Sequence, residues 1–470
     1  MTSVQMLPTE KGEEFEMLAK TMYGLEDILQ KELEELGAKE IIPGRRMVAF
    51  KGDLELLYKA NIHLRTALRI LVPIAQFEAK NADEIYQYLY DNIAWTKYLN
   101  SRSTFAFDTV VYSEDFTHSK FVAYRAKDAV SDYFTDHGDK RPNVSVSDPD
   151  VLFHIHISEN TVTLALDSSG ESLHKRGYRV SQNEAPISEV LAAGILLRSG
   201  WSGESAFLDP MCGSGTFLIE AALIALHIPP GIYRSQYAFE RWYNFDADLL
   251  SEVLEDWDEV PCEHKIYGSD SNPKSIAIAR ANIKTAGLQN YIDLSVKAIE
   301  EYSRENRPAE SGMIMMNPPY GDRMKPDDLE QLYSNIGSTL KHGFPGWKAW
   351  IITGSITEGF DAIGLKHFHR EKLFNGALET ELRAFDLFEG KRDLHLHELE
   401  ESGELEEIRS RRMAVRRSRD DFRESRQSYR FGKASNDRPV PRRRREPSET
   451  SSRDDRRAWQ DAFRDRKKNN

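Results

Sequence analysis

Two short motifs, each at the end of a predicted strand, constrain the fold of this chain most strongly. The first is Phe207–Thr216, in which an apolar segment ends in Asp209 and a turn contains Gly213 and Gly215. An apolar segment, 217–226, follows it. A strand, a glycine turn and a helix in this order form nucleotide sites, where small residues let the backbone approach a ligand. The third glycine of the dinucleotide fingerprint is missing, and an ordinary α/β turn is the alternative interpretation.

The second motif is Asn317-Pro318-Pro319-Tyr320, which follows an apolar run, 312–316, that we interpret as a buried strand. An asparagine side-chain carbonyl and a proline backbone carbonyl can both accept hydrogen bonds from an NH2 group, and an aromatic ring can stack on the base that carries it. Taken alone, the tetrapeptide also fits a strand-ending turn. Together, the two motifs indicate an enzyme that methylates an exocyclic amine of a nucleic-acid base.

A third strand lies between the two motifs. Residues 265–270 end in Asp270, where a carboxylate at a strand tip could accept hydrogen bonds from both hydroxyls of a ribose. The predicted helix 273–286 follows directly. This order of strands predicts an α/β Rossmann-like sheet of the kind found in methyltransferases that use S-adenosylmethionine. Cys212 lies in the glycine turn rather than beside the base, which argues against methylation of a pyrimidine through a covalent adduct.

The front of the chain has a different organisation. Strands and helices alternate in a mixed order up to a predicted hairpin at 153–166, which indicates an α+β region of two small ferredoxin-like units. His154 and His156 fall on one face of that hairpin, and we interpret this face as solvated, with contact to RNA phosphates as the alternative. This half contains no paired acids and no metal-ligand cluster, so no metal is expected.

Composition limits the class of protein. A chain of 470 residues with 40% hydrophobic residues can form two or three cored domains. No run of about 18 apolar residues predicts a membrane span, and residues 1–14 lack the apolar core of a signal peptide. Cys212 and Cys262 provide neither a disulfide framework nor a zinc set. We therefore expect a cytoplasmic protein with no membrane contact and no obligate protein partner.

Charge is distributed unevenly along the chain. The net charge is −13, yet residues 409–470 contain 22 Lys and Arg against 10 Asp and Glu, so this segment is +12 and residues 1–408 are −25. We expect the Arg-rich tail, 405–470, to be disordered because it has too little apolar periodicity for a core. It could attract RNA phosphates, or it could act as a solubilising tail or fold back on the acidic body.

Several stretches together resemble the THUMP-domain methyltransferases, in particular those that methylate guanine N2 in bacterial 23S rRNA. The resemblance covers roughly residues 15–390. It is carried by the two motifs above and by the following stretches: 24–26 (GLE), 141–144 (RPNV), 165–170 (ALDSSG), 173–179 (LHKRGYR), 185–187 (API) and 267–270 (YGSD). It implies a ferredoxin-like unit at 15–58, an RNA-binding THUMP domain at 59–170, a linker at 171–186 and a catalytic domain at 187–392.

The resemblance also implies roles for individual residues. Catalysis would rest on Asn317, Pro318, Pro319 and Tyr320. S-adenosylmethionine would be held by Asp209, Met211, Gly213, Gly215, Asp270, Ser271, Ser188 and Glu189, although a plain helix cap explains Ser188 and Glu189 equally well. RNA would be bound by Arg141, Lys175, Arg176 and Arg179.

Two features of the chain, one residue and one segment, depart from the family pattern. Relatives often have an acid where this chain has Ala298, which leaves the contact to the cofactor adenine to Glu300 or to backbone groups. Some relatives also continue into a second methyltransferase domain, where this chain has the Arg-rich tail.

Three other interpretations stay open from the sequence. They are an adenine-N6 methyltransferase acting on RNA or DNA, a tRNA guanine-N2 methyltransferase, and a non-catalytic RNA-binding assembly factor. The substrate implied by the resemblance is 23S rRNA or an assembly intermediate of the large subunit.

Overall fold

The computed structural model describes residues 3–4, 12–116, 118–182, 186–319, 326–354, 357–390 and 406. All of them belong to one compact unit. Tyr320 and, apart from Glu406, the predicted tail 405–470 lie outside the described residues. No helix in the described part of the chain combines the length and the apolar character needed to cross a membrane.

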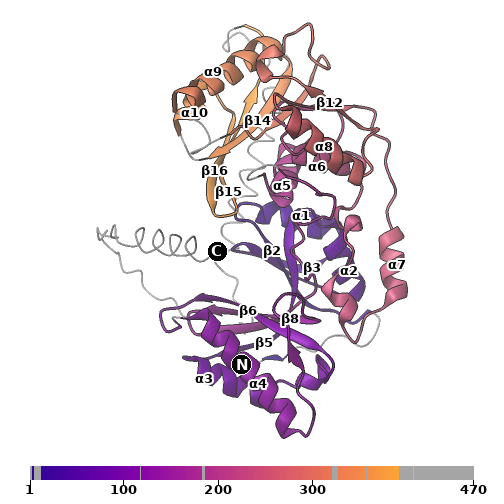
Figure 1. Ribbon diagram of the computed structural model, residues 1–470, viewed down its shortest axis with the longest axis vertical. Coiled ribbons are helices and arrows are strands. Elements are labelled where there is room, and N and C mark those ends of the chain that lie inside the picture. Colours follow the sequence, from indigo (N-terminus) through magenta and orange to yellow (C-terminus); the bar gives the residue numbers. More distant parts are fainter. Residues whose placement is uncertain are drawn as a thin grey trace. The chain divides into compact units, whose positions relative to one another are not determined.

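The front half of the chain, up to residue 167, is built on one sheet (Figure 1). Among the described residues this sheet has nine strands. Its order is β3-β4-β2-β5-β9-β8-β6-β7, with β1 also paired to β5. The strands are β1 (Ser3–Val4), β2 (Phe15–Thr21), β3 (Lys39–Gly44), β4 (Met47–Gly52), β5 (Ala67–Glu78), β6 (Thr104–Tyr112), β7 (Asn143–Val144), β8 (Val151–Ser158) and β9 (Thr161–Asp167).

Four helices pack on this sheet: α1 (Glu26–Glu35), α2 (Leu54–His63), α3 (Ala82–Asn92) and α4 (Ser119–Asp136). Strand β8 shows why they pack on one side, because Val151, Phe153, Ile155 and Ile157 are buried while the residues between them are only partly buried. Asp53 caps the start of α2, since its side chain accepts a hydrogen bond from the Leu56 N–H at 3.1 Å. Such a cap contributes about 1 kcal/mol.

The two predicted ferredoxin-like units are not separate in space. Strand β5 pairs with β2 on one side and with β9 on the other, so the sheet continues from one unit into the next. The predicted boundary at residue 58 falls inside α2 rather than in a linker. One long strand therefore serves both units, which local periodicity alone does not reveal.

The expectation of a solvated face for the histidines is wrong. The His154 side chain is 12% exposed and lies between Asp108 and Asp167, at 3.2 and 3.0 Å. Burial, followed by the charge of Lys20, lowers the pKa of His156 to about 4, so His156 is neutral at pH 7.

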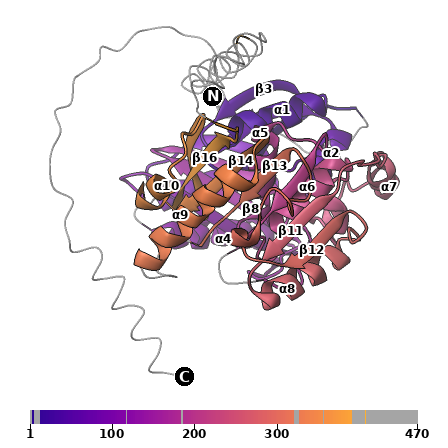
Figure 2. The same cartoon turned by 90° about the horizontal axis from the view of Figure 1, so that it is seen from above.

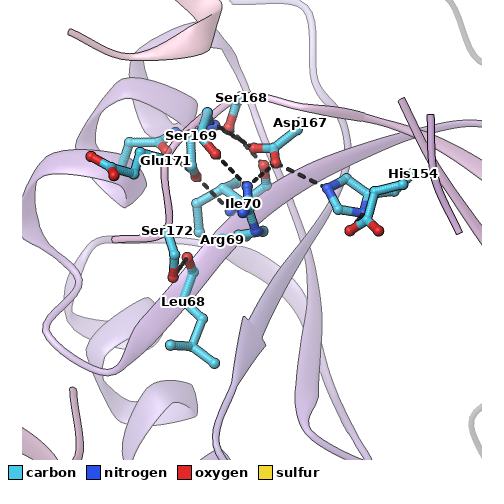
Figure 3. A network of polar contacts seen from close by, with 12 residues as sticks. Leu68, Arg69, Ile70, His154, Asp167, Ser168, Ser169, Glu171 and Ser172 are labelled. Carbon is cyan, nitrogen blue, oxygen red and sulfur yellow. Dashed lines mark hydrogen bonds and ion pairs between the residues drawn. The ribbon is translucent and has the colours of Figure 1, made fainter. Parts of the chain in front are cut away.

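Asp167 anchors the end of β9 to β5 (Figure 3). It is fully buried, yet the hydrogen bond from His154 and the charge of Arg69 outweigh the effect of burial and lower the pKa of its carboxyl. The hydroxyls of Ser168 and Ser169 continue the network, as one donates to the Ile70 carbonyl and the other accepts from the Ile70 N–H. These contacts hold the backbone in place where the chain leaves the front sheet.

The rear half contains a second sheet, in which the described residues form seven strands in the order β12-β11-β10-β13-β14-β16-β15. Its strands are β10 (Ala206–Asp209), β11 (Ile266–Asp270), β12 (Ile292–Val296), β13 (Gly312–Met316), β14 (Trp347–Gly354), β15 (His369–Asn375) and β16 (Leu378–Asp386). The strands β10 to β14 are parallel, whereas β16 is antiparallel to both of its neighbours.

Helices cover both faces of this sheet, as expected for parallel strands joined by crossover helices. One core contains α5 (Glu189–Ser199), α6 (Thr216–Ala225) and α8 (Pro273–Thr285), and the other contains α9 (Pro326–Gly343) and α10 (Thr357–Ala362) (Figure 2). The remaining helix, α7 (Ala247–Glu255), packs on α2 of the front half.

Arginines join the two halves through hydrogen bonds. Arg198 on α5 donates to both Asp27 oxygens on α1, at 2.8 and 2.7 Å, and lies 3.2 Å from a Glu371 oxygen on β15. Arg234 donates to four backbone carbonyls around the start of the linker, those of Ser169, Glu171, Ser172 and Lys175. The start of the linker is thus held by the rear half.

Candidate active site

Both sequence motifs end at the same edge of the rear sheet. Strands β10 and β13 are adjacent and parallel, with Leu208 opposite Ile314, so the residues that follow them emerge side by side. The strand order also reverses between β10 and β13. Ligands of doubly wound sheets bind at such a switch point, outside the carboxyl ends of the strands.

A cavity of about 500 Å³ lies at this edge. This volume falls within the roughly 300–1,000 Å³ of small-ligand sites. Of the predicted residues, the cavity is lined by Asp209, Met211, Gly213, Asp270, Ser271, Asn317 and Pro319. Two motifs that are far apart in the sequence therefore share one cavity.

The glycine turn has the backbone geometry that its sequence predicts. Gly213 and Gly215 have φ angles of +53° and +84°, in the left-handed region that favours glycine. A Cβ at Gly215 would lie 3.2 Å from the Ala279 Cβ on α8. Gly215 therefore does not line the cavity but lets α6 pack closely on α8.

Asp270 holds the glycine turn from the next strand. Its Oδ2 accepts a hydrogen bond from the Gly213 N–H at 3.0 Å, and its Oδ1 accepts one from the Asn272 N–H at 2.8 Å. Each carboxylate oxygen has a further lone pair, so Asp270 can accept additional hydrogen bonds from a ligand in the cavity.

Asp209 is the most perturbed acid of the site. It is 2% exposed, and its carboxylate accepts a hydrogen bond from the Met211 N–H at 3.1 Å. Burial raises the pKa of this carboxyl well above its ordinary value, and the nearby charge of Asp270 raises it further. A buried acid of this kind is a candidate partner for a cationic group.

Cys212 is poorly suited to be a nucleophile. Burial, followed by the charges of Asp209 and Asp270, raises the pKa of its thiol well above the ordinary value. The reactive thiolate is therefore scarce at neutral pH, in agreement with the sequence argument.

The loop after β13 is held by a hydrogen bond from helix α9. The Pro319 carbonyl accepts a hydrogen bond from the Tyr333 hydroxyl of α9 at 3.4 Å, and the same hydroxyl bonds to Thr353 on β14. Pro318 is buried, whereas Asn317 and Pro319 reach the cavity wall.

Some cavity residues were missed or left unassigned by the sequence analysis. Ile187 lines the cavity from the linker end, next to Pro186 of the Ala-Pro-Ile stretch. At the other end lie Ala298, Ile299 and Glu300, the segment where the adenine contact was unassigned. The Glu300 carboxylate already accepts a hydrogen bond from Asn335 at 3.1 Å.

Ser188 and Glu189 do not line this cavity. They line a larger, neighbouring cleft, and the Glu189 carboxylate accepts a hydrogen bond from Arg179 at 2.6 Å. Ser188 begins α5, although its hydroxyl makes no capping hydrogen bond. The structure thus separates these two residues from the other predicted cofactor residues.

The predicted RNA-binding residues fall into two groups. Arg141 and Lys175 are exposed and available at the surface. Arg176 is 2% exposed and donates to the carbonyls of Leu173 and Arg65, so its assignment to RNA phosphates is wrong. Arg179 is 14% exposed and is bonded to Glu189, Ser214 and Thr216, where it supports the glycine turn.

The described residues provide no group of three or more His, Cys, Asp or Glu side chains that could hold a metal ion.

A doubly wound sheet with a cavity at its switch point and an acid after each of two neighbouring strands defines a methyltransferase-like fold, and comparisons with known proteins agree. The chain matches the RlmL ferredoxin-like domain over residues 16–71, the THUMP domain over 79–167 and the RMKL-like, methyltransferase domain over 176–384.

Relatives match across most of the chain. The "Ribosomal RNA large subunit methyltransferase K/L" of Syntrophotalea carbinolica is 38% identical over 380 residues, which cover 78% of this chain and 53% of the relative. The chain thus spans about half the length of the curated relatives it matches.

Two solved structures are similar in both sequence and fold. SMU.472, described as a candidate methyltransferase and complexed with SAH, is 30% identical with a TM-score of 0.72, and the match covers 81% of this chain and 100% of that one. A predicted N6-adenine-specific DNA methylase of Listeria monocytogenes is 29% identical with a TM-score of 0.70, and the match covers 80% and 97%. The chain belongs to the family of THUMP-domain methyltransferases.

Proposed function

We propose that this chain transfers the methyl group of S-adenosylmethionine to the exocyclic N2 amine of a guanine in 23S rRNA. The observation that carries the proposal is that Asn317 and Pro319 line the same cavity as Asp209, the glycine turn and Asp270. The name printed for the relative from Syntrophotalea carbinolica supports an rRNA substrate.

The residues of the cavity fit this cofactor. Asp270 would accept hydrogen bonds from the ribose hydroxyls of the cofactor, and the glycine turn would let the cofactor approach the backbone closely. Asp209 has a buried carboxylate that the cationic end of the cofactor would neutralise. The segment 298–300 at the far end of the cavity would enclose the adenine. The SAH bound to the similar protein SMU.472 supports this assignment.

The chemistry required of the protein follows from the weak nucleophilicity of the guanine amine, whose lone pair is delocalised into the ring. The cofactor supplies an electrophilic methyl group on sulfur. The Asn317 side-chain carbonyl and the Pro318 carbonyl would accept the two N–H bonds of the amine and so orient its lone pair out of the plane of the ring. Orientation and fixed dipoles of this kind supply much of the acceleration in such reactions.

The position of the loop supports this role. The hydrogen bond from Tyr333 to the Pro319 carbonyl fixes the backbone beside Asn317. The target base must be unpaired or turned out of its helix to reach the cavity. Tyr320, outside the described residues, is proposed to stack on it.

The remaining partners are proposals of the same kind. Arg141 and Lys175 are exposed cations that we assign to RNA contact, and 23S rRNA or an assembly intermediate of the large subunit is the proposed substrate. We place the reaction in the cytoplasm, with neither a membrane nor an obligate protein partner.

A second candidate is adenine-N6 methylation. It is favoured by the similar structure from Listeria monocytogenes, which is described as a predicted N6-adenine-specific DNA methylase. The same two acceptors can hold an adenine amine, so the distinction depends on the substrate and not on this tetrapeptide.

Identification of the product nucleoside tests the proposal. The protein is incubated with an isotopically labelled methyl donor and unmodified 23S rRNA, tRNA or DNA, and the digested nucleosides are resolved by mass spectrometry. N2-methylguanosine from 23S rRNA supports the proposal, whereas N6-methyladenosine supports the second candidate. N2-methylguanosine from tRNA alone would mean that the protein performs the same reaction on tRNA instead of 23S rRNA.

A further inference from the structure

A second and larger cleft, of about 1,400 Å³, adjoins the cofactor cavity. Most of its lining comes from four segments: the loop after β2, the tip of the β3–β4 hairpin, the linker, and the β15–β16 hairpin. Pro186 and Ile187 line both the cleft and the cavity, so the two spaces meet at these residues. The cleft exceeds the roughly 300–1,000 Å³ of small-ligand pockets, which points to a larger occupant.

Two arginines project from the hairpin tip into this cleft. Arg45 and Arg46 are both exposed, and neither forms an ion pair within the described part of the chain. The backbone beneath them is fixed, because the Arg46 N–H donates to Glu26 at 2.9 Å and its carbonyl accepts from the Thr21 N–H at 3.0 Å. The residues up to 408 carry a net charge of −25, so two unpaired cations at one tip stand out against their surroundings.

The linker and β15 add cations to the lining that are only weakly paired. Lys372 on β15 forms an ion pair with Glu379 in which both side chains are about half exposed, and Lys175 of the linker forms a similar pair with Glu171. Exposed pairs of this kind contribute roughly 0–1 kcal/mol, so a phosphate can compete for either lysine. The acid Glu189 is already paired to Arg179.

Two aromatic rings line the same cleft. Tyr23 and Phe374 meet edge to face, with ring centroids 5.7 Å apart and planes at 89°. Tyr23 is 37% exposed, and the Lys372 ammonium lies 5.8 Å from the Phe374 ring. A groove of cations with interleaved aromatic rings is the arrangement that holds single-stranded nucleic acid.

We propose that this cleft holds the single-stranded RNA that flanks the target nucleotide. Arg45 and Arg46 bind its phosphates, and Tyr23 and Phe374 stack on its bases. The shared wall at Pro186 and Ile187 then leads the target base from the strand into the catalytic cavity. This proposal rests on the proposed function and identifies which conformation of RNA the site takes.

The test compares the double variant Arg45→Ala/Arg46→Ala with the wild-type protein in binding a short fluorescein-labelled single-stranded RNA across a salt series. Each phosphate contact contributes about −0.7 to the slope of log K against log salt for a single strand. The slope of the variant should therefore be less negative by about 1.4, because two phosphate contacts are lost. At 0.15 M salt this change corresponds to roughly 14-fold weaker binding. A variant with the wild-type slope would overturn the proposal.

Two further variants make the result specific. Lys341→Ala/Lys348→Ala removes the same charge from exposed positions at the opposite edge of the rear sheet, and it should leave the slope unchanged. Tyr23→Ala should weaken binding about fivefold, the low end for one stacked base, without changing the slope. Titration with SAH shows that each variant is folded.

The two proposals fail separately. If the arginine variant shows the predicted change in slope but the wild-type protein methylates no RNA, the proposed function is wrong and the cleft assignment stands. If it methylates RNA while the arginine variant keeps the wild-type slope and affinity, the cleft assignment is wrong and the proposed function stands.

Discussion

Replacement of Asp209 by Asn should remove a pH dependence from cofactor binding. This carboxyl is 2% exposed and accepts a hydrogen bond from one backbone N–H. Burial, and then the charge of Asp270, raise its pKa well above the ordinary value of 3.8. A cationic cofactor favours the ionised form, so binding should release a proton wherever the free protein holds one.

The magnitude follows from linkage. Below the raised pKa of Asp209, the affinity for S-adenosylmethionine should rise with pH by up to about tenfold per pH unit, or about 1.4 kcal/mol, and it should level off above that pKa. In Asp209→Asn the affinity should be lower and should not depend on pH in this range. Folding has the opposite pH dependence: the stability that neutral Asp209 provides is present below its unfolded pKa and is lost as the pH rises through its folded pKa.

Calorimetry in buffers of different ionisation enthalpy measures the released proton directly. The wild-type protein should show a buffer-dependent binding enthalpy, and Asp209→Asn should not. Asp293→Asn is a matched control, because it makes the same change at an exposed position on β12. Proton uptake, or an enthalpy that is equal in all buffers for the wild-type protein, would refute the reasoning.

Four further predictions follow. Asn317→Ala should lower turnover by about 10²–10³ with little change in cofactor affinity, as expected for the loss of one positioned acceptor, and single-turnover kinetics would measure it. Asp270→Ala should weaken SAH binding by about 1.5–3 kcal/mol in calorimetry. Arg198→Met removes the guanidinium that pairs with the partly buried Asp27 and the buried Glu371, so denaturation should show a loss of about 3–5 kcal/mol. Arg370→Met, which breaks a pair whose arginine is half exposed, should cost at most about 1 kcal/mol. Truncation after Glu407 removes a +12 segment and should flatten the salt dependence of RNA binding without changing the methylated base.

The catalytic half could be predicted well from the sequence because its signals are local. An acid or an asparagine directly after a buried strand must emerge at the carboxyl edge of a parallel sheet, and Asp209, Asp270 and Asn317 all do so. Glycine at positions 213 and 215 was equally informative, since the turn requires positive φ angles at both positions.

The front half was harder to predict because its pairings are long-range. The contact between β5 and β9 joins residues far apart in the sequence, so the merging of two predicted units into one sheet leaves no local signal. The burial of Arg176 was hidden for a similar reason. A basic stretch in a predicted linker suggests solvated side chains, yet Arg176 is held inside by the Arg65 carbonyl and lies 3.5 Å from Glu220.

The cleft depends on tertiary structure in the same way. Arg45 and Arg46 occupy a hairpin turn with no motif of its own, and they become informative only because Tyr23, Lys372 and the linker line the same cleft. Ser188 and Glu189 show the reverse case, since a position at the start of a helix suggested the cofactor, whereas the structure places them in the cleft.

Methyl transfer to an RNA that lacks the N2 amine tests the central claim most directly. A 23S rRNA transcript made with inosine in place of guanosine lacks this amine, while its adenine amines are intact. The protein should label the guanosine transcript and leave the inosine transcript unlabelled, although both transcripts bind. Equal labelling of the two transcripts would contradict guanine-N2 methylation and would point to the adenine amine.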